Sequence, residues 1–226
     1  MSVRSSPDFY TELDAIVESL LDALAFVHDQ GLLHRDIAPD NIMIRKDGKP
    51  CLIDFGAARQ ALTQRSQLMT GIVKTGFSPP EQYTTSGRAQ GAWTDIYALG
   101  ATIYRCITGK VPPEATERQI DDEVRPLAET IVSPDRYRPS FLAGIDAALR
   151  LKQAERPQTV AVWRAMLAGM PSDNANPPRD ATMEVATPPL SFTASPDLAH
   201  VLSVDHEGLR TGQTLGSMLL GRMAAG

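Results

Sequence analysis

The amino-acid sequence predicts an α+β fold that is mostly helical and contains one short β-hairpin. Two stretches repeat apolar residues at the three- and four-residue spacing of a buried helix face. Two short apolar runs flank an Asp-Gly pair at 47–48, which is a strong hairpin signal. Hydrophobic residues make up 42% of the chain and charged residues 22%, as in a globular domain rather than a coiled coil or a disordered chain.

The first expected elements are a helix and the hairpin. The helix has an apolar face that recurs at helical spacing, formed by Ile16, Leu20, Leu24 and Val27. We expect it to end at Asp29-Gln30-Gly31. The apolar runs at 42–44 and 51–53 then form two strands, because the turn residues at 46–49 separate them.

The second half of the globular part is expected to be a helical bundle. Residues 57–92 are rich in Thr, Ser, Gly and Gln, and we expect a long loop there. Thr94 is the expected N-cap of a central helix whose apolar face is formed by Ile96, Leu99, Ile103 and Ile107. Gly109 and the prolines at 112–113 should end this helix. Two further helices are expected at 143–151 and 160–167.

The composition changes near residue 170 and predicts two regions. Residues 1–170 form the folded domain in this interpretation, and residues 171–226 form a proline-rich, disordered linker and tail. Six of the 26 residues at 171–196 are proline, and no periodic apolar pattern runs through that stretch. The apolar residues at 215–225 are expected to be a frayed end, with a short helix or a docking tail as the alternative.

Charge and cysteine content exclude several classes of function. The formal net charge is −5 and the chain has no run of basic residues, so we expect no nucleic-acid partner. Cys51 and Cys106 are too few for a disulfide framework or a zinc site, and they indicate a reducing, cytoplasmic setting. No stretch of about 18 apolar residues is present, and we expect no transmembrane segment.

Two motifs carry the expected chemistry. The string His34-Arg35-Asp36-Ile37-Ala38-Pro39-Asp40-Asn41 lies between the first helix and the hairpin, and Asp54-Phe55-Gly56 follows the hairpin. These residues resemble the H-R-D-x-x-x-x-N and D-F-G motifs of protein kinases, and the surrounding sequence looks most like bacterial serine/threonine kinases. The resemblance covers about residues 9 to 168, which implies the large C-terminal lobe of a kinase.

The resemblance also implies a role for each site residue. Asp36 would be the catalytic residue that accepts or orients the proton of the acceptor hydroxyl. Asn41 and Asp54 would bind Mg²⁺, because their hard oxygen atoms suit that ion, and they would help to bind ATP. Met43 and Ile53 would line the adenine pocket. The implied partner is a protein substrate that carries the serine or threonine hydroxyl.

Further landmarks extend the likeness to kinases that act on proteins. Pro79-Pro80-Glu81 matches the A-P-E end of the activation segment, with Pro in place of Ala. By resemblance, Asp95 would hold the backbone of the catalytic loop, and Arg156 would pair with Glu81. Phe55 would pack beside His34. Hydroxyls of the activation segment are candidate phosphosites, namely Thr63, Ser66, Thr70 and Thr75.

The sequence departs from the kinase pattern in three places, one of which is a Thr75–Glu81 segment that is one residue shorter than usual. The 226 residues contain no G-x-G-x-x-G loop and no strand lysine of the V-A-I-K type, so the small N-terminal lobe is missing from the resemblance. A separate N-lobe or a regulatory partner is the expected complement, and the chain alone should have little or no activity. Ala38 stands where serine/threonine kinases usually have a lysine that contacts the transferred phosphate, and this removes one stabilising contact.

Two other functions compete with a protein kinase. A non-catalytic, kinase-like module could bind substrates or regulators through its helical surface. A small-molecule phosphotransferase of the aminoglycoside-kinase type has a similar catalytic loop and metal aspartate. That family lacks the combination of Glu81, Asp95 and Arg156, so the sequence favours a protein substrate.

Overall fold

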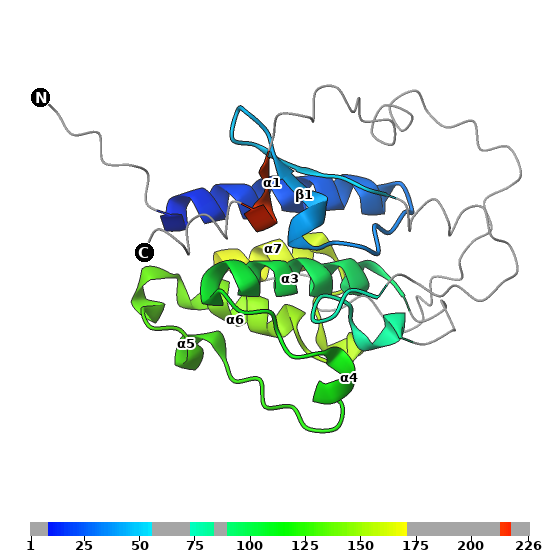
Figure 1. Cartoon of the computed structure of the whole chain (residues 1–226), viewed down its shortest axis with the longest axis vertical. Helices are drawn as coiled ribbons and strands as arrows, with labels where there is room; N and C mark the ends of the chain where they lie inside the picture. Colours follow the sequence, from blue (N-terminus) through cyan, green and yellow to red (C-terminus); the bar gives the residue numbers. More distant parts are fainter. Residues whose placement is uncertain (1–8, 56–72, 84–89, 171–212, 218–226) are drawn as a thin grey trace, which may run out of the picture.

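The fold was described from a computed structural model, which covers residues 9–55, 73–83, 90–170 and 213–217. Four helices carry most of the packing: α1 (Phe9–Asp29), α3 (Ala92–Thr108), α6 (Pro139–Ala148) and α7 (Val160–Ala168). A small sheet lies beside α1, and the short helices α4 (Ala115–Arg118) and α5 (Leu127–Thr130) lie at the opposite end (Figure 1). This arrangement confirms the predicted mostly helical α+β class.

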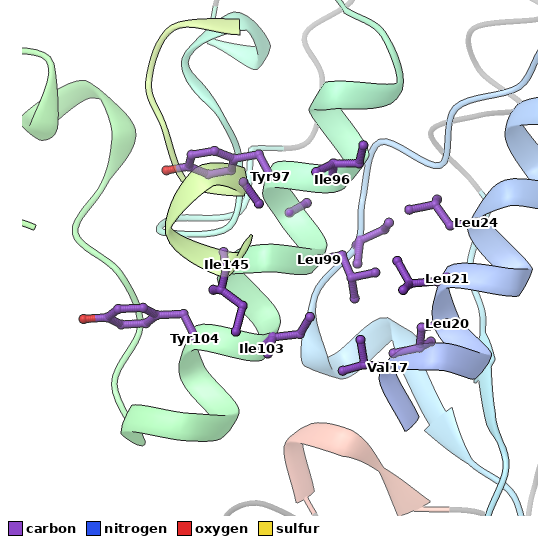
Figure 2. Packing of buried hydrophobic residues seen from close by; sticks show 14 of the residues in the cluster. Val17, Leu20, Leu21, Leu24, Ile96, Tyr97, Leu99, Ile103, Tyr104 and Ile145 are labelled. Carbon is purple, nitrogen blue, oxygen red and sulfur yellow. The ribbon is translucent and has the colours of Figure 1, made fainter. Parts of the chain in front are cut away.

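The hydrophobic core includes the interface between α1 and α3 and continues to α6 and α7. Figure 2 shows side chains of α1 pointing at side chains of α3, with Leu21 and Leu24 on one side and Leu99 on the other. The sequence predicted both apolar faces from their helical spacing. Burying one leucine or isoleucine side chain stabilises a fold by about 1.5–3 kcal/mol, so this face anchors the two helices. α1 leads into a turn at Gly31, whose φ of 70° suits a glycine.

The start of α3 differs from the prediction. The helix begins at Ala92, with Gly91 as its N-cap, so Thr94 is the third helical residue rather than the cap. Thr94 still serves the helix end, because its Oγ1 accepts a hydrogen bond from the Gly91 N–H at 3.2 Å. The other end is as predicted: Gly109 is left-handed, with φ 71°, and its N–H donates to the Arg105 carbonyl.

The bounds of α6 also differ from the predicted 143–151. The helix begins at Pro139. Proline suits the first helical position because an N–H at that position would have no partner within the helix. It ends at Ala148, and beyond that end the carbonyls of Arg150 and Leu151 accept hydrogen bonds from Arg156. α6 packs closely on α3, where a Cβ on Gly100 would lie 2.9 Å from the Ala148 Cβ.

The hairpin has the predicted turn and one shifted strand. β1 (Ile42–Ile44) pairs antiparallel with β2 (Pro50–Leu52), with Met43 opposite Cys51. Gly48 takes φ 80° in the turn, as the Asp-Gly pair predicted. The sequence did not predict β3 (Gln213–Thr214), which pairs antiparallel with the other edge of β1. β1 is therefore the central strand, in the order β2-β1-β3.

Short 3-10 turns connect these elements. They are η1 (Pro39–Asn41), η2 (Pro80–Gln82), η4 (Pro134–Arg136) and η5 (Gln153–Glu155). Within the described residues, the region expected to be a long loop contains a tight turn at 74–78 and the 3-10 turn η2, and Thr75 is exposed. The other candidate phosphosites, Thr63, Ser66 and Thr70, lie outside the described residues.

The C-terminal region is described only at 213–217, so the domain boundary at residue 170 stays a prediction. Of the stretch at 215–225, residues 215–217 are helical with Leu215 buried, which matches the short-helix and docking-tail alternatives, and residues 218–225 lie outside the described residues. Within the part of the chain that the structure describes, no helix combines the length and the apolar character needed to cross a bilayer.

Candidate active site

The predicted catalytic loop joins α1 to β1 and is held by one buried carboxylate. Asp95, in the first turn of α3, accepts hydrogen bonds from the backbone N–H groups of His34 at 2.9 Å and Arg35 at 2.8 Å. His28 at the end of α1 donates through Nε2 to the same carboxylate, also at 2.8 Å. These bonds confirm the role that the resemblance implied for Asp95, and they join three elements at the loop.

The charge of Asp95 is maintained by its neighbours. Burial by itself would raise the pKa of this carboxyl, because a charge is poorly solvated inside the protein. The hydrogen bond from His28 and the nearby backbone N–H of Arg35 outweigh that effect and hold the pKa of Asp95 below its usual range. The loop is therefore held by an ionised carboxylate.

His34 links the two predicted motifs through its imidazole ring. Its Nδ1 accepts a hydrogen bond from the Asp36 N–H at 3.3 Å, and its Nε2 donates to the Ile53 carbonyl at 3.2 Å. Only a neutral ring can accept at one nitrogen and donate at the other. Burial lowers the pKa of His34, which favours this neutral form. The ring also packs on Phe55 at 4.5 Å between centroids, as the resemblance implied.

Asp36 is held at one oxygen and left open at the other. Asn41 donates through Nδ2 to the Asp36 carbonyl at 2.7 Å and to Asp36 Oδ2 at 2.8 Å. Asp36 Oδ1 accepts no hydrogen bond within the described residues. It lies 3.5 Å from Lys74 Nζ in a partly buried ion pair. The arrangement fixes the orientation of the carboxylate while leaving one oxygen available to accept a proton.

Sequence reasoning missed Lys74. The lysine is positioned by a tight turn, in which its carbonyl accepts hydrogen bonds from the N–H groups of Phe77 at 3.0 Å and Ser78 at 2.9 Å. Gly76 makes the turn possible, because its φ is 78° and a Cβ there would collide with Val111. The only sequence signal was Ala38, which stands where related kinases usually have a lysine. That signal does not indicate which other residue supplies the positive charge.

A buried ion pair anchors the segment that carries Lys74. Arg156 donates through both terminal nitrogens to Glu81, at 2.7 and 3.1 Å, and both side chains are almost completely buried. Thr94 Oγ1 donates to the same carboxylate at 3.0 Å. The guanidinium also lies over the Tyr97 ring, 4.9 Å from its centroid. The geometry confirms the pairing that the resemblance implied between Glu81 and Arg156.

A further link, which sequence reasoning also missed, joins η2 to the catalytic loop. Gln82 donates through Nε2 to the Arg35 carbonyl at 2.7 Å. Arg35 itself has φ 66°, and Asp54 has φ 62°, so both motifs contain a residue in the left-handed region that non-glycine residues rarely adopt. Such conformations persist where the surrounding contacts hold them, and they are frequent at functional sites.

The structure places the remaining predicted site residues around this loop. Asn41 uses its side-chain nitrogen on Asp36, which leaves its Oδ1 for a cation. Asp54 is exposed directly after the half-buried Ile53, whose carbonyl is held by His34. Met43 is half-buried in β1, two residues after Asn41 in the chain. The donor types of Asn41 and Asp54 fit a hard divalent cation, while the adenine contacts of Met43 and Ile53 stay predictions.

Comparison with known proteins agrees with this geometry. The protein kinase domain model matches residues 6–165. Serine/threonine-protein kinase D of Synechocystis sp. is 42% identical over 111 residues, which is 46% of this chain and 21% of that protein. Serine/threonine-protein kinase PknA of Nostoc sp. is 37% identical over 152 residues, which is 62% of this chain and 25% of that protein.

A solved structure of the apo form of PpkA-294 is also similar. It aligns with a TM-score of 0.59 and 41% identity, over 70% of this chain and 54% of that one. Sperm motility kinase 2B of Mus musculus matches at 37% identity over 58% of this chain and 26% of its own length. The chain thus spans about a quarter of the length of such curated relatives.

Proposed function

This chain belongs to the protein kinase family, and on that premise we propose that it supplies the large lobe for transfer of the ATP γ-phosphate to a serine or threonine hydroxyl of a protein. The observation that carries the proposal is the state of Asp36. Its carboxylate is oriented through Oδ2 by Asn41, and Oδ1 accepts no hydrogen bond within the described residues. A carboxylate in this state can take the proton of an acceptor hydroxyl, or orient that hydroxyl toward a phosphate.

Asn41 and Asp54 are the residues that would hold Mg²⁺. When bound, the ion neutralises negative charge on the phosphates of ATP. The side-chain nitrogen of Asn41 is used on Asp36, so the orientation of its Oδ1 is coupled to the orientation of Asp36. By the family resemblance, Met43 and Ile53 would contact the adenine; Met43 lies two residues after Asn41, and Ile53 directly precedes Asp54.

Lys74 would stabilise negative charge near the reacting oxygen. Ala38 is buried and carries no cation, whereas the Lys74 ammonium lies 3.5 Å from Asp36 Oδ1. A positive charge held beside the place where charge develops lowers the barrier to phosphoryl transfer. The turn at Gly76 and the Glu81–Arg156 pair would act by keeping this ammonium in place.

A fusion protein tests the proposal. The small lobe of the Nostoc PknA relative would be joined to the N-terminus of this chain, and transfer from radiolabelled ATP to casein would be measured with Mg²⁺. We expect phosphoserine and phosphothreonine in the product, and a loss of about 100- to 10,000-fold with Asp36→Asn. Equal transfer by the fusion and its Asp36→Asn variant would contradict the proposed role of Asp36.

Nucleotide binding by the unfused chain gives a second readout, in case the two lobes do not fit. Calorimetry should detect Mg²⁺-dependent ATP binding that is weakened at least tenfold in Asp54→Ala. Binding that does not depend on Mg²⁺ or Asp54 would favour a non-catalytic binding module. Asp47→Ala is the matched control, because Asp47 is an exposed aspartate in the hairpin turn.

A further inference from the structure

The segment at 213–217 makes specific contacts with the kinase lobe, although it is far from the lobe in sequence. Gln213 and Thr214 pair antiparallel with Ile44 and Met43, on the edge of β1 that β2 leaves open. Figure 1 shows the segment in red beside β1. An edge strand with free N–H and C=O groups is a ready template for another strand, and this segment covers that edge.

One apolar side chain anchors the segment. Leu215 is only 2% exposed and belongs to the same core cluster as the buried faces of α1 and α3. Thr214 and Ser217 shape the chain around it, because the Ser217 N–H donates to Thr214 Oγ1 at 3.1 Å and the Ser217 hydroxyl donates to the Thr214 carbonyl at 3.0 Å. The contact thus combines backbone pairing with a buried leucine.

The segment also borders the proposed active site. A Cβ on Gly216 would lie 2.7 Å from Asp40 Oδ1 and 3.6 Å from the Pro39 Cβ, so the backbone there packs on η1. The next residue in η1 is Asn41, which orients Asp36. The strand partner of Thr214 is Met43, the residue predicted to contact adenine.

We propose that the open edge of β1, together with the buried apolar site of Leu215, is a docking site for a peptide that forms a short strand followed by a helical turn, and that its occupant is the chain's own 213–217 segment. Addition of a strand to a sheet edge gives affinity through main-chain hydrogen bonds, and a buried side chain adds specificity. Here the buried side chain is Leu215, and Gly216 follows it against Asp40.

The chain connectivity supports docking within one molecule. Forty-two residues separate Met170 from Gln213. Fully extended, they would reach roughly 140 Å, at about 3.3 Å per residue, far more than the size of one lobe. A tethered segment meets its site at an effective concentration that can be millimolar, so modest contacts suffice to keep it docked. This inference does not depend on whether the lobe transfers phosphate.

Hydrogen exchange on the full chain tests the docking. Leu215→Asp should expel the segment, because an aspartate cannot be buried unpaired in an apolar pocket. We expect exchange of the Ile44 amide, which faces β3, to become at least tenfold faster in this variant. Val132→Asp is the matched control, since it places an aspartate at a fully exposed apolar position of the lobe, and it should leave this amide unchanged. Equal protection in all three proteins would overturn the proposal.

A peptide added in trans identifies the occupant. A fluorescent peptide with the sequence of residues 210–220 should bind the Leu215→Asp chain and restore protection of the Ile44 amide, which also shows that the variant is folded. It should bind the wild-type chain at least tenfold more weakly, because the site is already filled. Absence of binding to the variant, or equal binding to both chains, would overturn the docking site. A wild-type dimer in sedimentation that Leu215→Asp dissociates would mean that a second copy is the occupant, which overturns docking in cis.

Discussion

Asp95 and Asp36 are two aspartates of the same site with opposite environments. Asp95 is completely buried, and its two oxygens accept three hydrogen bonds, from His28 and from the backbone of His34 and Arg35. The side chain of Asp36 is 10% exposed, with one oxygen held by Asn41. Its other oxygen faces the Lys74 ammonium at 3.5 Å and accepts no hydrogen bond within the described ranges.

The different environments of Asp95 and Asp36 distinguish a carboxylate that stabilises the fold from one that is available for catalysis. A buried carboxylate is costly unless its oxygens are satisfied, and a satisfied one ties neighbouring elements together. Glu81 belongs with Asp95 in this respect, because Arg156 and Thr94 satisfy it. Asp36 keeps an open oxygen, so removing its charge should cost little stability. Variants of these residues should therefore fall into two classes.

The largest effect is expected from Arg156→Met. The change leaves the Glu81 carboxylate buried without its ion-pair partner, and breaking a buried pair in this way typically costs about 3–5 kcal/mol. Urea denaturation measures the free energy of unfolding. Arg164→Met is the matched control, because Arg164 pairs with Asp22 at 2.6 Å on the exposed surface and should cost under about 1 kcal/mol. Similar losses for the two variants would contradict the structural role of the buried pair.

A smaller loss is expected from Asp95→Asn. Asparagine has nearly the same shape, but one acceptor oxygen becomes an NH₂ group that faces a donor, and the charge is lost. Hydrogen bonds to charged groups contribute about 1.5–3 kcal/mol each, so we expect the free energy of unfolding to fall by about 2–3 kcal/mol. Hydrogen exchange should also show faster exchange of the His34 and Arg35 amides. Unchanged protection there would mean that Asp95 does not hold the loop.

The neutral His34 predicts a pH dependence of stability. Its folded pKa is lowered by burial, so above about pH 6.5 neither the folded nor the unfolded state binds a proton at this ring. As the pH falls below that value, the unfolded state binds the proton first, and stability decreases by up to about 1.4 kcal/mol per pH unit. Urea denaturation at pH 7.5 and 5.5 should show this loss, and His34→Gln should reduce it. An equal loss in His34→Gln and in the unaltered chain would refute the assignment.

The smallest effects on stability are expected from Asp36→Asn and Lys74→Met. Both residues belong to a partly exposed pair without a hydrogen bond, so each variant should change the free energy of unfolding by less than about 1 kcal/mol. In the fused kinase, Lys74→Met should lower kcat by about 100-fold with little change in KM for ATP, and Lys74→Arg should restore part of it. If either variant lowered the free energy of unfolding by several kcal/mol, the proposed distinction between structural and reactive charges would be wrong.

Local sequence patterns determined much of this protein. Helical spacing predicted the buried faces of α1 and α3, and the Asp-Gly pair predicted the hairpin turn, because these patterns act over a few neighbouring residues. The motifs around Asp36 and Asp54 indicated the family, and the order of the later landmarks indicated the contacts of Asp95 and Arg156. Each of those contacts is present at hydrogen-bond distance.

Only the tertiary structure decided which distant groups meet. Lys74 reaches Asp36 through a tight turn at Gly76, where a Cβ would collide with Val111. Thr94 donates a hydrogen bond to Glu81 from the first turn of α3, which begins at Ala92. The docking of Leu215 on β1 depends on a pocket that exists only after α1 and α3 have packed. The spacing of residues along the chain determines local geometry. Contacts between distant residues depend on the path of the whole backbone, which a short sequence pattern does not specify.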